Sequence, residues 1–109
     1  MNKKEMFRNY MQKQKIKKSG KPIKPNLIEL YIKELSKLSD YMYEAGVIEK
    51  RIYSMASYEE ICESIKKIRR AEHFEGKNKD SENRLNKALN YYLDFASYAF
   101  KKEEEEVNL

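Results

Sequence analysis

The 109-residue chain is long enough for one domain and too short for two independent hydrophobic cores. It combines 40% hydrophobic with 38% charged residues and a net charge of +5, so we expect a small core under a heavily solvated, basic surface. With only three glycines and two prolines it is poorly suited to a fold built on tight β-turns, and no apolar run is long enough to span a membrane.

The amino-terminal end and the cysteine content indicate a compartment. The first residues, MNKKEMF, lack the apolar stretch of a signal peptide. Cys62 is the single cysteine, which excludes an intrachain disulfide. Both observations favour a protein of the reducing cytoplasm.

Residues 1–25 are expected to form a basic helix followed by a linker. Apolar residues recur on one helix face at Met6, Phe7, Tyr10 and Met11. Ser19, Gly20 and the two prolines then interrupt the pattern. Basic side chains of this segment, opposed only by Glu5, are Lys3, Lys4, Arg8, Lys13, Lys15, Lys17, Lys18, Lys21 and Lys24.

A helical bundle is expected over residues 26–102, and its first long helix over residues 27–44. Asn26 is placed to cap this helix, and Gly46 lies where a helix commonly closes in the left-handed conformation. Its apolar stripe comprises Leu27, Ile28, Tyr31, Leu35, Leu38, Tyr41 and Met42. Residues 47–56 should form a short turn of helix or an extended connector.

Two further helices follow in the prediction. A capping box formed by Ser57 and Glu60 starts a helix that should run to Arg70, with its inward residues at Tyr58, Ile61, Ile65 and Ile68. A polar connector over residues 72–78 should lead to a last helix, capped by Asp80 or Ser81 and ending near residue 101. The stripe of that helix comprises Leu85, Ala88, Leu89, Tyr92, Phe95, Ala96 and Ala99. With an acidic tail at 103–109, the pattern predicts an all-α, compact bundle of four to five helices.

Residues able to support catalysis are scarce. His73 and Cys62 are alone of their kind, fall on different predicted elements and have no third group to orient them. No cluster of His, Cys or carboxylates has the spacing of metal ligands, and the scattered glycines form no phosphate-binding loop. We expect no enzyme activity, no metal, no cofactor and no small-molecule substrate.

Two groups of basic residues predict binding to duplex DNA through phosphate contacts. One lies on the linker; the other brackets the connector before the last helix and gathers at one end of the domain if the last two helices pack antiparallel. The predicted DNA-binding residues are Lys15, Lys17, Lys18, Lys21, Lys24, Lys66, Lys67, Arg69, Arg70, Lys77, Lys79, Arg84 and Lys87. The alternative for the second group is a solvated helix face, since acidic residues interleave with it.

Polar and aromatic residues near these cations add two hypotheses. Asparagine can read an adenine edge, and the candidates are Asn78, Asn83, Asn86 and Asn90. Tyr91 and Tyr98 fall off the stripe of the last helix, so they are candidates for stacking on bases or for anchoring a protein partner.

Three segments resemble a known helical module: LIELYIKELSKLSDYMYEAGV, IYSMASYEEICESIKKI and NRLNKALNYYLDFASY. They look like the SAM-like core-binding domain of phage integrases and tyrosine recombinases, and like similar modules of some restriction proteins. The resemblance covers roughly residues 26–100, and its matching positions are Tyr31, Leu35, Leu38, Ala88, Leu89, Tyr92 and Phe95.

The resemblance implies a SAM-like bundle that acts as a non-catalytic DNA-binding accessory or targeting domain of a mobile-element or restriction system. The recombinase catalytic domain is absent from the sequence, so strand cleavage is not implied. The alternative is a small protein-interaction module or regulator, which forms homo-oligomers or occupies the DNA site of a partner.

Overall fold

The computed structural model describes residues 2–16 and 18–101. Its elements are α1 (Lys3–Gln12), α2 (Pro25–Glu44), the 3₁₀ turn η1 (Ile52–Ser54), α3 (Tyr58–Arg70), α4 (Phe74–Asp80), α5 (Arg84–Ala96) and the π-helical turn η2 (Ser97–Lys101). Over these residues the only β-type pairing is an isolated bridge between Lys15 and Pro22. The prediction of an all-α bundle of four to five helices is confirmed. No described helix is long and apolar enough to cross a bilayer.

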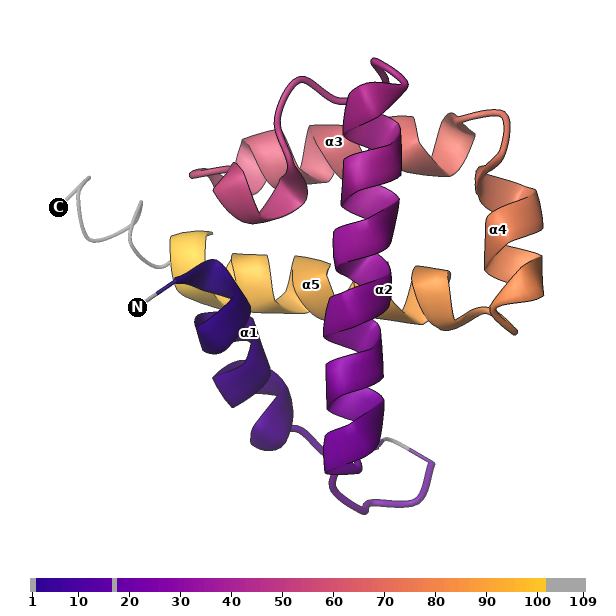
Figure 1. Cartoon of the computed structure of the whole chain (residues 1–109). Helices are drawn as coiled ribbons and strands as arrows, with labels where there is room; N and C mark the ends of the chain where they lie inside the picture. Colours follow the sequence, from indigo (N-terminus) through magenta and orange to yellow (C-terminus); the bar gives the residue numbers. More distant parts are fainter. Residues whose placement is uncertain (1, 17, 102–109) are drawn as a thin grey trace, which may run out of the picture.

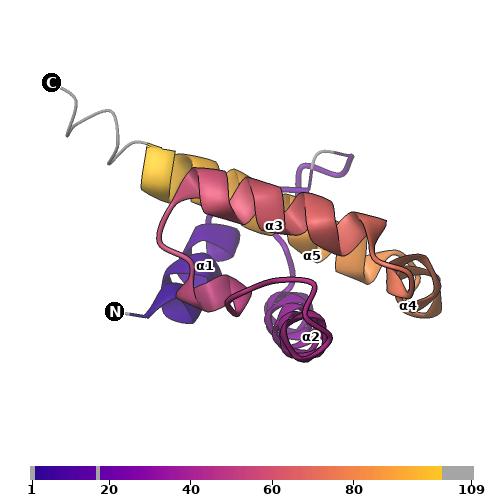
Figure 2. The same cartoon turned by 90° about the horizontal axis from the view of Figure 1, so that it is seen from above.

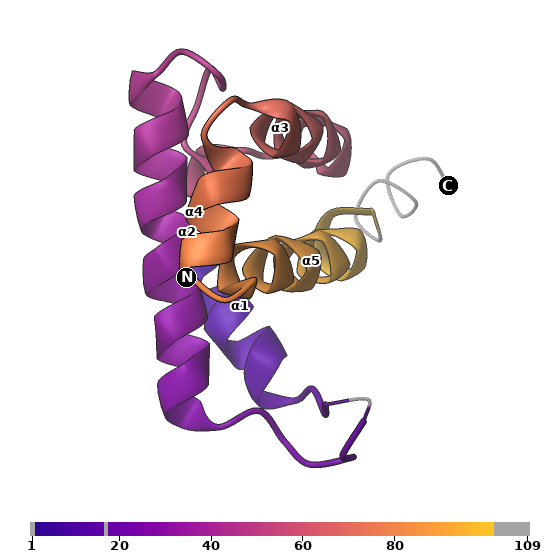
Figure 3. The ribbon, with the colours of Figure 1, turned by 90° about the vertical axis from the view of Figure 1, so that its right-hand side faces the viewer.

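The helices pack in two layers. α3 and α5 run side by side in opposite directions and are joined at one end by α4 (Figures 1 and 2). α2 crosses over α5 in the second layer, as the side view in Figure 3 shows. This arrangement places the C-terminal end of α3, α4 and the N-terminal end of α5 together, as the antiparallel packing predicted.

The hydrophobic core lies where the two layers meet. The predicted stripes of α2, α3 and α5 supply most of it, because residues spaced by 3.6 positions face the same neighbour. The fully buried large side chains include Leu35, Met42, Ile61, Ile65, Ile68, Leu89 and Tyr92. Burial of a leucine or isoleucine side chain is worth about 1.5–3 kcal/mol, so these stripes are the main source of stability.

Four stripe positions differ from the prediction. Tyr41 is 37% exposed, while Leu27, Tyr58 and Ala99 are only partly buried. Leu27, Tyr58 and Ala99 still pack against the core, and Tyr41 contacts Lys77 of α4 through the face of its ring.

α1 is part of the same core and not an appended arm. Phe7 and Met11 are fully buried, and the ring of Phe7 meets that of Tyr92 edge-on, with centroids 4.9 Å apart and an interplanar angle of 82°. Ile23, in the segment expected to be a linker, is only 4% exposed. Residues 1–25 therefore do not stand apart from the 26–102 bundle in the described structure.

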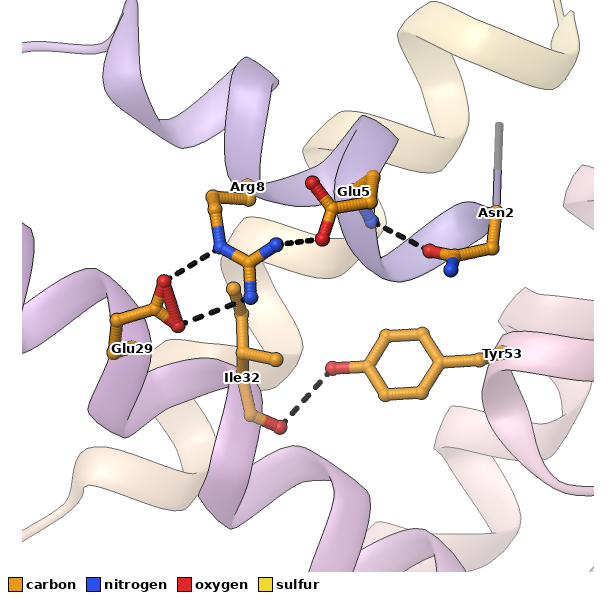
Figure 4. A network of polar contacts seen from close by, with 6 residues as sticks. All are labelled: Asn2, Glu5, Arg8, Glu29, Ile32 and Tyr53. Atoms are coloured by element: carbon orange, nitrogen blue, oxygen red, sulfur yellow. Dashed lines mark hydrogen bonds and ion pairs between the residues drawn. The ribbon is translucent and has the colours of Figure 1, made fainter.

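Polar contacts fix α1 against α2 (Figure 4). Nε and Nη2 of Arg8 donate to the two carboxylate oxygens of Glu29, at 2.5 and 3.1 Å, and Nη1 bonds Glu5. Below them, the hydroxyl of Tyr53 donates to the carbonyl oxygen of Ile32 at 3.2 Å. The hydrogen bonds from Arg8 lower the pKa of Glu29 below its ordinary value, so this bidentate pair stays ionised.

Helix α2 begins two residues before its predicted start. Pro25 occupies the first helical turn and Lys24 is the cap, without a side-chain hydrogen bond, so the prediction of Asn26 as the cap is wrong. Proline is favoured at this position because its fixed φ suits the first turn and its missing N–H is not needed there. Gly46, with φ +76°, closes the helix as expected.

The connector predicted over residues 72–78 is instead largely helical, which corrects the sequence analysis. α4 is short and has a single buried anchor, Phe74, so it shows no periodic stripe. Its end caps α5: the hydroxyl of Ser81 accepts from the N–H of Leu85 at 3.2 Å, and Oδ1 of Asn78 accepts from the N–H of Asn86 at 2.9 Å. The N-cap of α5 is Asn83, with φ +68° and no side-chain cap hydrogen bond, so the prediction of Asp80 or Ser81 as the cap is wrong, although Ser81 does satisfy one N–H of the first turn.

Candidate nucleic-acid interface

Five of the predicted DNA-binding residues line one of two hollows. The first, which we call the α2–α4 hollow, is a cavity of about 370 Å³ lined by Glu34, Tyr41, Lys77, Arg84 and neighbouring residues. Nε of Arg84 donates to Oε1 of Glu34 at 2.9 Å, and the ammonium of Lys77 lies 4.1 Å from the centroid of the Tyr41 ring. Both cations are thus occupied by partners inside the fold.

The second hollow, which we call the lysine cleft, lies between the 13–24 loop, the start of α2 and the exposed side of α5. It has a volume of about 510 Å³. Three of the predicted DNA-binding lysines line it, Lys15 and Lys18 from the loop and Lys87 from α5, together with Asn90 and Asp94. No ion pair joins these lysines to an acidic side chain among the described residues.

Local hydrogen bonds join backbone groups of the loop that carries Lys15 and Lys18. The N–H of Ile16 donates to the carbonyl of Lys21 at 2.8 Å, and the N–H of Gly20 donates to the carbonyl of Ile16 at 2.7 Å. Gly20 has φ +67°, a conformation that glycine adopts at little cost. Together with the burial of Ile23, these bonds make the expected linker an ordered turn on the side of α5.

The inner part of the lysine cleft is apolar and aromatic. Ile16, Ile23 and Leu27 contribute to it, with the rings of Tyr10, Tyr31 and Tyr91. The rings of Tyr31 and Tyr91 are tilted by 39° with centroids 5.5 Å apart, and Tyr91 is half-buried.

Burial raises the pKa of all three cleft tyrosines, Tyr10, Tyr31 and Tyr91, above its ordinary value near 10. Because an acid with a raised pKa keeps its proton, these side chains remain neutral below about pH 10. Among the described residues, Asp94 is the one carboxylate in the lining of the cleft.

Arg69 connects α3 to the lysine cleft. Its Nη2 donates to Oδ1 of Asn90 at 2.5 Å, and its Nε donates to Oδ1 of Asn86 at 3.1 Å. Asn90 also lines the cleft, so Arg69 of α3 holds one residue of the cleft wall without lining the cleft itself.

The four asparagines considered for base reading are engaged within the fold. Asn78 donates to Asn83 at 3.1 Å and caps α5, while Asn86 and Asn90 accept from Arg69. These side chains stabilise the fold through their hydrogen bonds. To read an adenine edge, they would have to replace these intramolecular hydrogen bonds with bonds to the base.

The other predicted residues lie outside both hollows. Lys66 pairs with Glu63, at 3.6 Å one turn away on α3. Five more of the predicted DNA-binding residues are exposed and line neither hollow: Lys21, Lys24, Lys67, Arg70 and Lys79. Lys17 and the acidic tail 103–109 lie outside the described residues.

Tyr98 is 64% exposed, as its place off the stripe predicted. Its ring lies beside that of Tyr10, with centroids 5.9 Å apart. The two rings line a third hollow of about 500 Å³ with Met6 and Ala99 among its walls. This surface adjoins the lysine cleft, because Tyr10 lines both.

Several cleft residues were not recognised from the sequence. The place of Tyr31 in a core stripe is confirmed, since Tyr31 is 5% exposed, but the stripe does not indicate that Tyr31 also borders a hollow. Asp94 belongs to no motif. Periodicity identifies the buried side of a helix, but it does not tell which stripe residue borders a hollow. The prediction failed here because the cleft is formed by residues far apart in the sequence.

The residues considered for catalysis stay apart in the fold. Cys62 lies half-buried on α3, and His73 is exposed just before α4. Among residues 2–16 and 18–101, no group of three or more His, Cys, Asp or Glu is arranged to hold a metal ion.

Comparison with known proteins assigns no family to the chain. No family model matches the chain, and it matches neither a curated protein nor a solved structure.

Proposed function

We propose that the chain is a non-catalytic domain that binds duplex DNA, with the lysine cleft at the centre of the surface that contacts the phosphates. The observation that carries this proposal is the meeting of basic residues from two segments that are far apart in sequence, with an arginine of α3 bound to the wall of the same cleft. Lys15 and Lys18 of the loop lie on the same cleft as Lys87 of α5, and Asn90 in that cleft binds Arg69 of α3.

The lysines of the cleft have no ion-pair partner among the described residues, which favours a polyanionic partner. A lysine without an ion-pair partner is available to replace counterions on DNA phosphates, and each such interaction adds affinity that falls with salt. Phosphate contacts position a protein on the duplex without reading its sequence. The proposal therefore concerns affinity and placement, and assigns no target sequence.

The biological setting follows from the resemblance of residues 26–100 to SAM-like core-binding domains. In this proposal the chain is an accessory or targeting domain of a mobile-element or restriction system and acts in the cytoplasm. Its all-helical fold is compatible with that class.

A second candidate function is a protein-interaction module, favoured by Tyr98. A tyrosine that is 64% exposed next to an apolar hollow is a common anchor for a protein partner or a second copy of the chain. In that case Tyr98→Ser abolishes a dimer or a complex in sedimentation experiments and leaves binding to DNA unchanged.

Fluorescence anisotropy with a short labelled duplex at several salt concentrations tests the DNA proposal. The double variant Lys18→Gln/Lys87→Gln should lower the log–log salt slope by roughly 0.9 for each phosphate that the protein no longer neutralises. The matched control is Lys33→Gln/Lys37→Gln, which removes the same charge from exposed positions on α2.

The control should keep a slope closer to that of the wild type, because α2 lies in the other layer from α5 (Figure 3). Equal reductions of the slope in the two variants would show that binding depends on net charge alone. Binding that is insensitive to salt would contradict the proposal outright.

A further inference from the structure

We propose that the lysine cleft accommodates one unpaired nucleobase of the bound DNA, held over the tyrosines between the lysines of the loop and of α5. The inference rests on the proposed function and deepens it. It predicts that the chain prefers a duplex with an unpaired nucleotide to the same duplex fully paired.

The size and the inner lining of the cleft fit a base. Its volume of about 510 Å³ falls in the range of small-ligand pockets, roughly 300–1,000 Å³. Ile16 and Ile23 line it together with the half-buried rings of Tyr10 and Tyr91, which are the ones a base can reach. The ring of Tyr31 is only 5% exposed and supports Tyr91 from within the core. Bases in an intact duplex are stacked on each other, so only an unstacked base can place its ring against such a surface.

The arrangement of charge favours a nucleotide over a free phosphate. Lys15, Lys18 and Lys87 supply cations from two different elements, suited to the phosphates on either side of a displaced nucleotide. Asp94 lies in the same lining and repels a phosphate. A carboxylate does accept hydrogen bonds from an exocyclic base amine, as aspartate does from cytosine N4.

The position of the cleft fits a base that leaves a duplex. Asn90 lies in the lining and is held by Arg69 of α3, so one more cation is bound to the wall of the cleft beside the site of the base. An acidic peptide would also be attracted by the lysines, but Asp94 in the same lining repels its carboxylates.

The experiment compares three labelled duplexes of the same sequence: fully paired, with one unpaired cytosine, and with one unpaired thymine. We expect the unpaired cytosine to bind about tenfold more tightly than the paired duplex, in line with stacking of one base on an aromatic side chain. Tyr91→Leu should remove this preference and retain the affinity for the paired duplex. Lys33→Gln/Lys37→Gln serves as the control that keeps the preference.

A second variant does not depend on packing. Asp94 is exposed, so Asp94→Asn should fold normally, as its thermal unfolding will show. Thymine has no exocyclic amine, and therefore the wild type should favour unpaired cytosine over thymine, while Asp94→Asn should reduce that difference. If Tyr91→Leu is destabilised, this selectivity alone decides.

The outcomes separate the inference from the proposed function. Equal affinity for paired and unpaired duplexes, or a preference that survives both substitutions, overturns the inference while salt-dependent duplex binding still stands. Displacement of the unpaired DNA by an acidic peptide at equal concentration also overturns it. No binding to any duplex overturns the proposed function itself.

Discussion

The α2–α4 hollow and the lysine cleft contain the same kinds of residue and differ in what faces them. In the hollow, Arg84 bonds Glu34 and Lys77 covers the ring of Tyr41. In the cleft, Lys18 and Lys87 line an aromatic surface without an ion pair to any described acid. The role of a basic residue is therefore set by the groups that the fold places opposite it. The sequence pattern predicts phosphate binding for all four of these residues.

The carboxylate of Glu34 makes this contrast sharper. Its side chain is 16% exposed, and its Oε2 is buried without a hydrogen-bond partner in the described structure. A half-buried carboxylate needs the opposite charge more than an exposed one does. The hollow thus uses Arg84 for stability, whereas the cations of the cleft remain available for binding.

The largest expected effect concerns the support of the lysine cleft. Phe7→Ala should lower the free energy of unfolding by about 3–5 kcal/mol, because it removes a fully buried ring packed on Tyr92. Urea unfolding measures this change. DNA binding should fall with it, since α1 leads directly into the loop that forms one wall of the cleft.

Met6→Ala, on the same helix but only partly buried, is the control and should cost less. A decrease below about 1 kcal/mol for Phe7→Ala would mean that α1 is an independent arm. The lysine cleft would then lack a fixed wall, and the comparison between the two hollows would fail.

A substitution pair of intermediate effect tests the contrast directly. Arg84→Met should lower the free energy of unfolding by about 1–2 kcal/mol, between exposed and fully buried ion pairs, because it leaves Glu34 without its partner. Lys87→Met, one turn along α5 and exposed, should change it by less than about 0.5 kcal/mol.

Affinity for DNA should show the reverse order, with Lys87→Met binding more weakly than Arg84→Met under conditions where both are folded. Chemical unfolding and anisotropy on the same two samples provide the measurements. If both variants lose stability and affinity to the same extent, the two hollows do not differ in role.

The smallest effects should come from the single lysines. Lys77→Gln removes a cation that lies over an aromatic ring, at a cost of about 0.5–1 kcal/mol in stability, and should leave the salt slope of DNA binding unchanged. Lys18→Gln should leave stability unchanged and reduce that slope by roughly 0.9. A reduced slope for Lys77→Gln would place the phosphate-binding surface on the α2 side.

Local sequence patterns correctly predicted the helices that depend on a capping box or on a periodic apolar stripe. The capping box is present, with the N–H of Glu60 donating to the hydroxyl of Ser57 at 3.1 Å, and the stripe of α5 is buried from Leu85 to Ala96. The pattern failed at α4, which has one anchor in Phe74 and no repeat. It also failed at the start of α2, where proline takes precedence over an asparagine cap.

Helical periodicity and composition were enough to predict the helical class, the main buried faces and the positions rich in basic residues. Which cations are neutralised and which meet aromatic rings depends on how the helices pack. Lys18 and Lys87 come together because α1 and Ile23 hold the loop beside α5, while Arg84 meets Glu34 because α2 crosses over that helix. Such contacts arise from packing between distant segments, which no local periodicity encodes.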